Sequence, residues 1–218
     1  LKFDVSPAPE KLQCGTEWRR TLGNRPVWLA ASTREGEEPF IPEAFSRIDL
    51  PGPLLLLVPR HPQRFNEVAA IIEERGLPFC RRSASAFPAP ETRVWLGDSM
   101  GEMPAYFAAS DIALIGGTLL PLGGQNLIEA AACGCPVVMG PHTFNFAQAA
   151  ELAEAAGAAR RVGDMAAGVA AALALSQRGP AHAAMSRAAL DFAGAHQGAA
   201  ARTADALAAV LERTKGLP

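Results

Sequence analysis

The sequence has little net charge, no long apolar segment and no pattern typical of a secretion signal. Its 218 residues carry a formal net charge of −2, which provides no general attraction for nucleic acid or anionic lipid. No apolar run approaches the length that spans a bilayer, and the first residues, LKFDVSP, lack a basic stretch followed by an apolar one. With 49% hydrophobic residues, the composition predicts a soluble globule whose partners are determined by a local site.

Metal and dinucleotide motifs are also absent. The four cysteines, Cys14, Cys80, Cys133 and Cys135, are not spaced as zinc ligands, and no histidine cluster accompanies them. We therefore expect reduced, buried thiols in a cytoplasmic protein, with neither a metal ion nor another cofactor. No GxGxxG motif follows the first apolar strand, which disfavours a dinucleotide site.

Short apolar strands alternate with helical patterns from residue 27 to about residue 175. The predicted strands cover residues 27–31, 54–58, 77–81, 93–96, 111–115, 136–140 and 159–162. This alternation predicts an α/β fold with a doubly wound, Rossmann-like parallel sheet and helices on both faces.

The chain divides into three predicted segments. Residues 1–26, with a helix around residues 10–22, are expected to be a linker and lead-in, and residues 27–176 the main domain. Residues 177–218 are alanine-rich and are expected to form helices that pack on that domain. The start at LKFD, followed by prolines, suggests the exit from a preceding domain, so we expect a fragment of a longer protein.

Loops that follow the strands of a parallel sheet share its carboxyl edge, where ligands of open α/β sheets bind. The most informative loop runs from Gly116 to Glu129 and reads GGTLLPLGGQNLIE. Its two glycine pairs allow positive φ angles and close backbone approach, and a helix predicted to begin near Gln125 presents free amides. Asn126 and Glu129 would share a helical face, where Glu129 could bind sugar hydroxyls. The alternative is a glycine-rich connection with a solvated glutamate.

The loop after the first strand reads STREGEE and places the hydroxyls of Ser32 and Thr33 at the same edge. These residues are candidates for ligand contacts. An ordinary helix N-terminus with an acidic first turn, containing Glu37 and Glu38, would also explain this segment.

Arg60 and His61 leave the second strand at its carboxyl end. A planar guanidinium there suits a phosphate or a carboxylate. Alternatively, Arg60 pairs with a nearby glutamate and His61 caps the helix that follows.

A third junction, Gly97 to Met103, opens a helix that extends through Ala109. Its backbone amides could bind an anion. Glu102 could instead be a first-turn acid, and Met103 could fill the core.

Four segments in this order resemble the C-terminal half of the 3-deoxy-D-manno-octulosonic acid (Kdo) transferases. They are STREGEE (32–38), PRHPQRF (59–65), GDSMGEM (97–103) and GGTLLPLGGQNLIEAAACGCPVVMGPHTFNF (116–146). The resemblance implies the C-terminal domain of a GT-B glycosyltransferase, in which two Rossmann-like domains face each other across a cleft. This domain would hold CMP-Kdo, the donor of Kdo for the lipid A precursor.

The resemblance also implies roles for individual residues, with Arg60 and His61 beside the donor phosphate and carboxylate. The cytidine monophosphate would be bordered by Gly101, Glu102 and Met103, and its phosphate and ribose held by Gly123, Gly124, Asn126 and Glu129.

The sequence departs from the family pattern at four positions. Gln125 replaces an expected His, and Ala130 an expected Pro, so the role of that histidine does not transfer directly to Gln125. Thr118 for Ser and Ser99 for Thr keep the hydroxyl.

By the same resemblance, the N-terminal domain would carry the general base, the lipid acceptor site and the membrane contact at the cytoplasmic face of the inner membrane. No catalytic residue is therefore expected in this chain, which would bind the donor for an inverting transfer and be inactive alone. Two alternatives stay open: another GT-B enzyme, such as a UDP-sugar transferase or 2-epimerase, and a nucleotide-binding module without chemistry.

Overall fold

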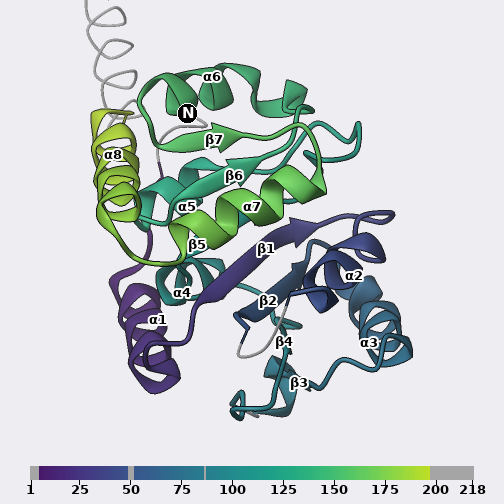
Figure 1. Ribbon diagram of the computed structural model, residues 1–218. Helices are drawn as coiled ribbons and strands as arrows, with labels where there is room; N and C mark the ends of the chain where they lie inside the picture. Colours follow the sequence, from purple (N-terminus) through teal and green to yellow (C-terminus); the bar gives the residue numbers. More distant parts are fainter. Residues whose placement is uncertain (1–4, 49–51, 86, 197–218) are drawn as a thin grey trace, which may run out of the picture.

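The computed structural model describes residues 5–48, 52–85 and 87–196, which form a layered α/β domain. Its seven-stranded sheet has the order β3-β4-β2-β1-β5-β6-β7, and every paired strand is parallel (Figure 1). The strands are β1 (Val27–Thr33), β2 (Leu54–Pro59), β3 (Phe79–Arg81), β4 (Val94–Leu96), β5 (Ile112–Ile115), β6 (Val137–Met139) and β7 (Ala159–Arg161). All seven predicted strands and the parallel architecture are thus confirmed.

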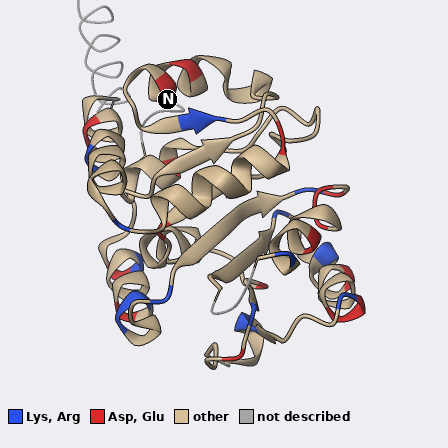
Figure 2. Cartoon of the chain, viewed as in Figure 1, with Lys and Arg blue, Asp and Glu red and all other residues tan. Residues whose placement is uncertain are grey.

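Helices cover both faces of the sheet, as the alternating pattern predicts. One face carries α1 (Pro9–Leu22), α4 (Met103–Ala109), α5 (Ile128–Ala132), α6 (Ala147–Ala155) and α8 (Pro180–His196). The other carries α2 (Phe40–Ser46), α3 (Phe65–Glu74) and α7 (Met165–Leu175). Figure 2 shows that α7 has no charged residue, whereas α1 and α3 carry several.

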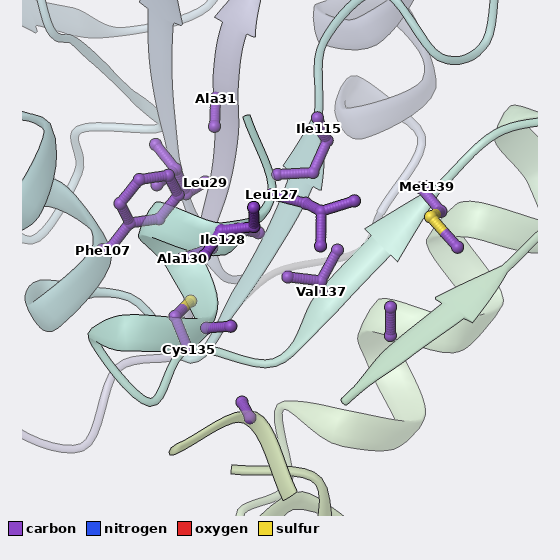
Figure 3. Packing of buried hydrophobic residues seen from close by; sticks show 14 of the residues in the cluster. Leu29, Ala31, Phe107, Ile115, Leu127, Ile128, Ala130, Cys135, Val137 and Met139 are labelled. Carbon is purple, nitrogen blue, oxygen red and sulfur yellow. The ribbon is translucent and has the colours of Figure 1, made fainter. Parts of the chain in front are cut away.

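The sheet separates two apolar cores because successive side chains of a strand point to opposite faces. On β1, Leu29 and Ala31 belong to the core under α4 and α5, and Trp28 belongs to the core under α2 and α7. Figure 3 shows Leu127 and Ile128 of the α5 segment close to side chains of β5 and β6. This packing holds α5 directly beside the carboxyl edge of the central strands.

The start of α5 differs from the prediction. The sequence predicts a helix from about Gln125, but α5 begins at Ile128 and is only 5 residues long. The amide of Ile128 donates to Oδ1 of Asn126 at 3.1 Å, and Gly124 has a φ of 79°. Asparagine side chains that bind nearby amides compete with helix formation, so the first turn is delayed by three residues.

Helix α1 lies within the predicted lead-in segment and packs closely against α4. On the same side of α1, Trp18 also packs edge-on against Trp95 of β4, with ring centroids 5.1 Å apart. A Cβ added to Gly15 would overlap the carbonyl oxygen of Ala105, so only glycine permits this approach. The division of the chain at residues 26 and 176 stays a prediction.

We expect Gly15→Ala to lower the free energy of unfolding by about 1–3 kcal/mol, because the new methyl group would overpack the contact between α1 and α4. Gly168→Ala on α7 is the matched control. Its Cβ would lie 3.8 Å from Val162, an ordinary contact, so the better helix former should raise stability by up to about 1 kcal/mol. Urea denaturation measures both values, and shifts of the same sign would contradict the close packing of α1 on α4.

Candidate functional site

The loops that follow β1, β2, β4, β5 and β6 all leave the carboxyl edge of the sheet. These five strands are neighbours in the order β4-β2-β1-β5-β6, so their loops form one continuous rim (Figure 1). The structure therefore places every sequence-predicted site residue on this edge or at the start of the helix behind it.

The loop after β1 reaches the glycine loop after β5 through an irregular backbone. Ser32 has a φ of 56°, and the pairing of β1 with β2 shifts register between Ala31 and Thr33. A Cβ on Gly116 would overlap the carbonyl group of Ser32, so the two segments are in direct contact. Thr33 is buried, and its hydroxyl makes no hydrogen bond with any residue that the structure describes.

Glu37 holds the backbone of the glycine loop. Its side chain is buried, and Oε2 accepts the amide of Gly117 at 2.7 Å and that of Arg34 at 3.1 Å. Burial raises the pKa of Glu37, and the hydrogen bonds from these amides only partly oppose that rise. Its partner Gly117 lies 80 residues away in the sequence, so Glu37 is more than a first-turn acid.

Glu38 is fully buried and binds Arg64 of the loop after β2. Oε2 of Glu38 accepts Nε of Arg64 at 3.1 Å and Nη2 at 2.7 Å. Arg64 also contacts Glu67 at 2.6 Å, and the hydrogen bond with Glu38 raises the pKa of the guanidinium. In the loop after β2, the arginine that pairs with a glutamate is thus Arg64, not Arg60.

Arg60 is exposed, and within the described ranges its side chain makes no hydrogen bond or ion pair. Its backbone amide donates to the carbonyl of Thr33 at 2.9 Å, which places the two loops side by side. His61 precedes a 3₁₀ turn, but its side chain accepts no capping hydrogen bond from the amides of that turn. The structure therefore favours neither of the local explanations for Arg60 and His61, and the guanidinium is available to a ligand.

The loop after β4 contains the carboxylate of Glu102, which other side chains of the protein already bind. Glu102 accepts Nη2 of Arg82 at 2.9 Å and the hydroxyl of Ser99 at 2.5 Å. Burial alone would raise the pKa of Glu102, but Ser99 and Arg82 outweigh burial and lower it. Gly101, with a φ of 74° and open space around it, leaves its backbone accessible, whereas Met103 packs partly against the core.

The loops after β5 and β6 form one interlocked unit. Gly123 and Gly124 are buried with φ angles of 87° and 79°, and a Cβ on Gly123 would overlap the side chain of Asn145. The amide of Asn145 donates to the carbonyl of Gly123 at 3.0 Å. Thr118 accepts the amide of Gly140 at 2.9 Å through its hydroxyl. Contacts within the chain therefore explain part of the need for glycine at positions 123 and 124.

Asn126 and Glu129 do not share a helical face as predicted, because α5 starts at Ile128, but their side chains are hydrogen-bonded to each other. Nδ2 of Asn126 donates to Oε1 of Glu129 at 3.0 Å, and Oε2 of Glu129 has no partner among the described residues. Both side chains are half-buried, as is Gln125, which makes no side-chain hydrogen bond within the described part of the chain. An oriented carboxylate with one free oxygen is suited to accept hydrogen bonds from hydroxyl groups.

The rim residues form separate clusters. No side-chain hydrogen bond between described residues connects these clusters across the whole edge. Ser32 contacts Gly116, Thr33 contacts the backbone of Arg60, and Asn126 contacts Glu129. Arg82 and Asn145 are not among the site residues that the sequence predicts, because their partners lie 20 or more residues away and no local spacing reveals them.

No other feature of the described residues is a better candidate for a functional site than this rim. No group of three or more His, Cys, Asp or Glu side chains is placed to hold a metal ion, and no described helix is long and apolar enough to cross a membrane. A hollow of about 1320 Å³ that includes Arg25 and Arg93 lies at the amino ends of the strands. A groove of about 770 Å³ lies between α2 and α7.

Comparison with known proteins identifies similar sequences. No protein-family model matches the chain. The 3-deoxy-D-manno-octulosonic acid transferase of Bordetella pertussis is 51% identical over 213 residues, covering 95% of this chain and 50% of that protein. The transferase of the same name from Haemophilus influenzae is 43% identical over 152 residues, covering 67% of this chain and 35% of that protein. The chain thus spans half or less of the length of these two relatives.

Solved structures give a similar result. The C-terminal CMP-Kdo binding domain of WaaA from Acinetobacter baumannii matches with a TM-score of 0.81 and 30% identity, covering 85% of this chain and 98% of that domain. HepE from Anabaena in complex with UDP matches with a TM-score of 0.64 and 17% identity, covering 95% of this chain and 54% of that protein. The second likeness shows the fold alone.

We expect the unmodified chain to lose stability relative to a Glu37→Gln variant as the pH rises. The folded-state pKa of Glu37 is raised, so between the ordinary and the raised pKa the folded state binds more protons than the unfolded state. The stabilising contribution is complete below the ordinary pKa of 4.5 and is lost as the pH rises through the raised value, whereas glutamine does not titrate. Urea denaturation from pH 4 upward measures the difference.

Glu43→Gln, which changes an exposed carboxylate on α2, is the control for this comparison. If the unmodified chain instead gained stability relative to Glu37→Gln as the pH rises, burial would not be the dominant influence on the pKa of Glu37.

Proposed function

Because this chain belongs to the 3-deoxy-D-manno-octulosonic acid (Kdo) transferase family, we propose that it is the donor-binding half of an inverting glycosyltransferase. The full enzyme would move Kdo from CMP-Kdo to the lipid A precursor in lipopolysaccharide biosynthesis. The observation that carries this proposal is the structural match to a domain described as binding CMP-Kdo. The match covers 85% of this chain and 98% of that domain. The same match confirms the predicted fold, the Rossmann-like C-terminal domain of a GT-B glycosyltransferase.

We propose that Arg60 and His61 bind the phosphate and carboxylate of the donor. Arg60 is exposed and lacks an internal partner among the described residues, so its guanidinium can form two parallel hydrogen bonds with an anion. In the transfer, negative charge accumulates on the departing cytidylate, and a fixed positive group beside that phosphate lowers the barrier. Thr33 lies next to this position, because its carbonyl accepts the amide of Arg60, and we propose that the hydroxyls of Ser32 and Thr33 also contact the donor.

The ribose is assigned to Glu129. Asn126 holds one oxygen of this carboxylate, so the other is oriented and can accept hydrogen bonds from ribose hydroxyls. Gln125 adjoins this pair and supplies an amide where the family has histidine. Gly123 and Gly124 shape the loop above the phosphate through their positive φ angles.

The segment of Gly101, Glu102 and Met103 is assigned to the border of the cytidine monophosphate. Because the Glu102 carboxylate is bound by Arg82 and Ser99, we propose that the backbone of this segment makes the contact. Gly101 has open space beside its Cα, which permits that approach.

The acceptor chemistry is assigned to the half of the relatives that this chain does not cover. An inverting transfer needs a base that removes the proton of the acceptor hydroxyl, and we propose no such base in this chain. That half would also bind the lipid A precursor and contact the membrane at the cytoplasmic face of the inner membrane. Neither a metal ion nor another cofactor is part of the proposal.

We expect the chain to bind CMP weakly, and more tightly than UDP, in isothermal titration calorimetry. Arg60→Ala and Glu129→Ala should each weaken CMP binding by about 10- to 100-fold, because each removes a charged hydrogen-bonding group worth about 1.5–3 kcal/mol. Arg47→Ala, which removes an exposed arginine of the α2 end, should leave the affinity unchanged.

Tighter binding of UDP would favour a UDP-sugar enzyme over the Kdo transferase. Unchanged CMP affinity in both site variants, with the fold retained, would show that the site is placed wrongly.

We also expect no transfer of Kdo from CMP-Kdo to a lipid A precursor by this chain alone, because the proposed base and acceptor site lie elsewhere. Release of CMP and formation of the glycosylated lipid, followed by mass spectrometry, provide the measurement. Substantial turnover by the purified chain would contradict the assignment of the chemistry to the other half.

A further inference from the structure

Glu37 and Glu38 are adjacent in the loop after β1. Both carboxylates are buried, although a loop at the edge of the sheet could expose such groups to solvent. Their exposed fractions are 1% and 0%. Removing a carboxylate from water is costly unless it is paired, so each of these side chains depends on partners. The partners of the two residues lie in two different loops of the rim.

Glu37 reaches both glycine pairs of the loop after β5. Its Oε2 accepts the amide of Gly117 at 2.7 Å, and the carbonyl of Gly117 accepts the amide of Gly124 at 2.8 Å. Two consecutive hydrogen bonds thus connect one carboxylate oxygen to the second glycine pair. Glycines have no side chain with which to hold their own conformation, so a loop that contains four of them depends on such an anchor.

Glu38 fixes the segment that contains Arg60 and His61. Arg64 donates two hydrogen bonds to Glu38, and its own amide donates to the carbonyl of His61 at 3.0 Å. At the other end of the segment, the amide of Arg60 donates to the carbonyl of Thr33 at 2.9 Å. The segment is therefore attached at one end to Thr33, the last residue of β1, and at the other end to Glu38 of the loop that follows.

We infer that Glu37 and Glu38 are positioning residues for the nucleotide-sugar donor, and that neither needs to touch it. Glu37 holds the glycine loop and Glu38, through Arg64, holds Arg60 and His61, so that both sides of the donor phosphate are in place before it binds. Fixing these groups in advance reduces the ordering that binding would otherwise require. The inference rests on the proposed function and adds to it residues that act through other residues.

The test is the affinity of the full 218-residue chain for CMP, measured by isothermal titration calorimetry at a temperature where each variant is folded. Glu37→Ala and Glu38→Ala should each weaken CMP binding by about tenfold or more, because the loops lose their anchors. Glu37→Gln and Glu38→Gln keep an oxygen acceptor of the same reach without the charge, so we expect an intermediate loss of about threefold. This graded recovery also provides the test if an alanine variant does not fold.

Leu175→Ala is the matched control because it removes a buried apolar side chain at the end of α7, a helix with no proposed ligand contact, and is expected to lower stability. We expect it to bind CMP as the unmodified chain does. If affinity instead decreased with stability in the same way for Leu175→Ala and the Glu variants, the role of Glu37 and Glu38 would be structural only.

The outcomes separate this inference from the function on which it rests. Absence of CMP binding by the unmodified chain would overturn both. CMP binding that is lost in Arg60→Ala or Glu129→Ala but unchanged in the folded Gln and Ala variants of Glu37 and Glu38 would overturn only the positioning role. Amide hydrogen exchange of Gly117 and Gly124 gives an independent measure, and we expect faster exchange in the Glu37 variants only.

Discussion

The buried carboxylate of Asp111 is the interaction on which the arrangement of the elements depends. At the start of β5 it is 2% exposed, and its Oδ2 accepts the amide of Val27 at 2.7 Å and Nη1 of Arg19 at 3.3 Å. Its Oδ1 accepts Nε of Arg178 at 2.5 Å. Leaving such a buried charge without partners costs about 3–5 kcal/mol, so β1, α1 and the turn before α8 converge on one residue.

The consequence of this convergence appears at the opposite edge of the sheet. Asp111 anchors the beginnings of β1 and β5, and the two strands then pair in register from Trp28 with Ile112 to Ala31 with Ile115. Because the register is set at the amino ends, it also decides which residues emerge together at the carboxyl ends. Ser32 therefore meets Gly116, and the two loops that border the candidate site are placed side by side.

Carboxylates serve as anchors along the rim as well. Glu37 holds backbone amides, Glu38 holds Arg64, and the buried Asp98 binds Arg81 at 2.6 Å and the amide of Ser83 at 2.8 Å. Each of these carboxylates has a partner within the chain, although Oε1 of buried Glu38 has none among the described residues, and Arg60 is an exposed guanidinium without a described partner. The Arg60 guanidinium and Oε2 of Glu129 are thus proposed ligand-binding groups that no described residue binds.

The amino-acid sequence by itself determined the seven strands, the parallel sheet and the edge at which the candidate site is proposed. These features follow from short-range patterns, since apolar runs such as Leu54–Pro59 and the glycines at 116–117 and 123–124 act on their immediate neighbours.

Only the tertiary structure decided the partners of the charged groups. The sequence left open whether Arg60 pairs with a glutamate, and the fold instead gives that role to Arg64, 26 residues from Glu38. The start of α5 was likewise decided by Asn126, whose side chain binds the amide of Ile128. Helix and strand patterns are encoded within a few residues, whereas the partner of a buried charge depends on which distant segments the finished fold brings together.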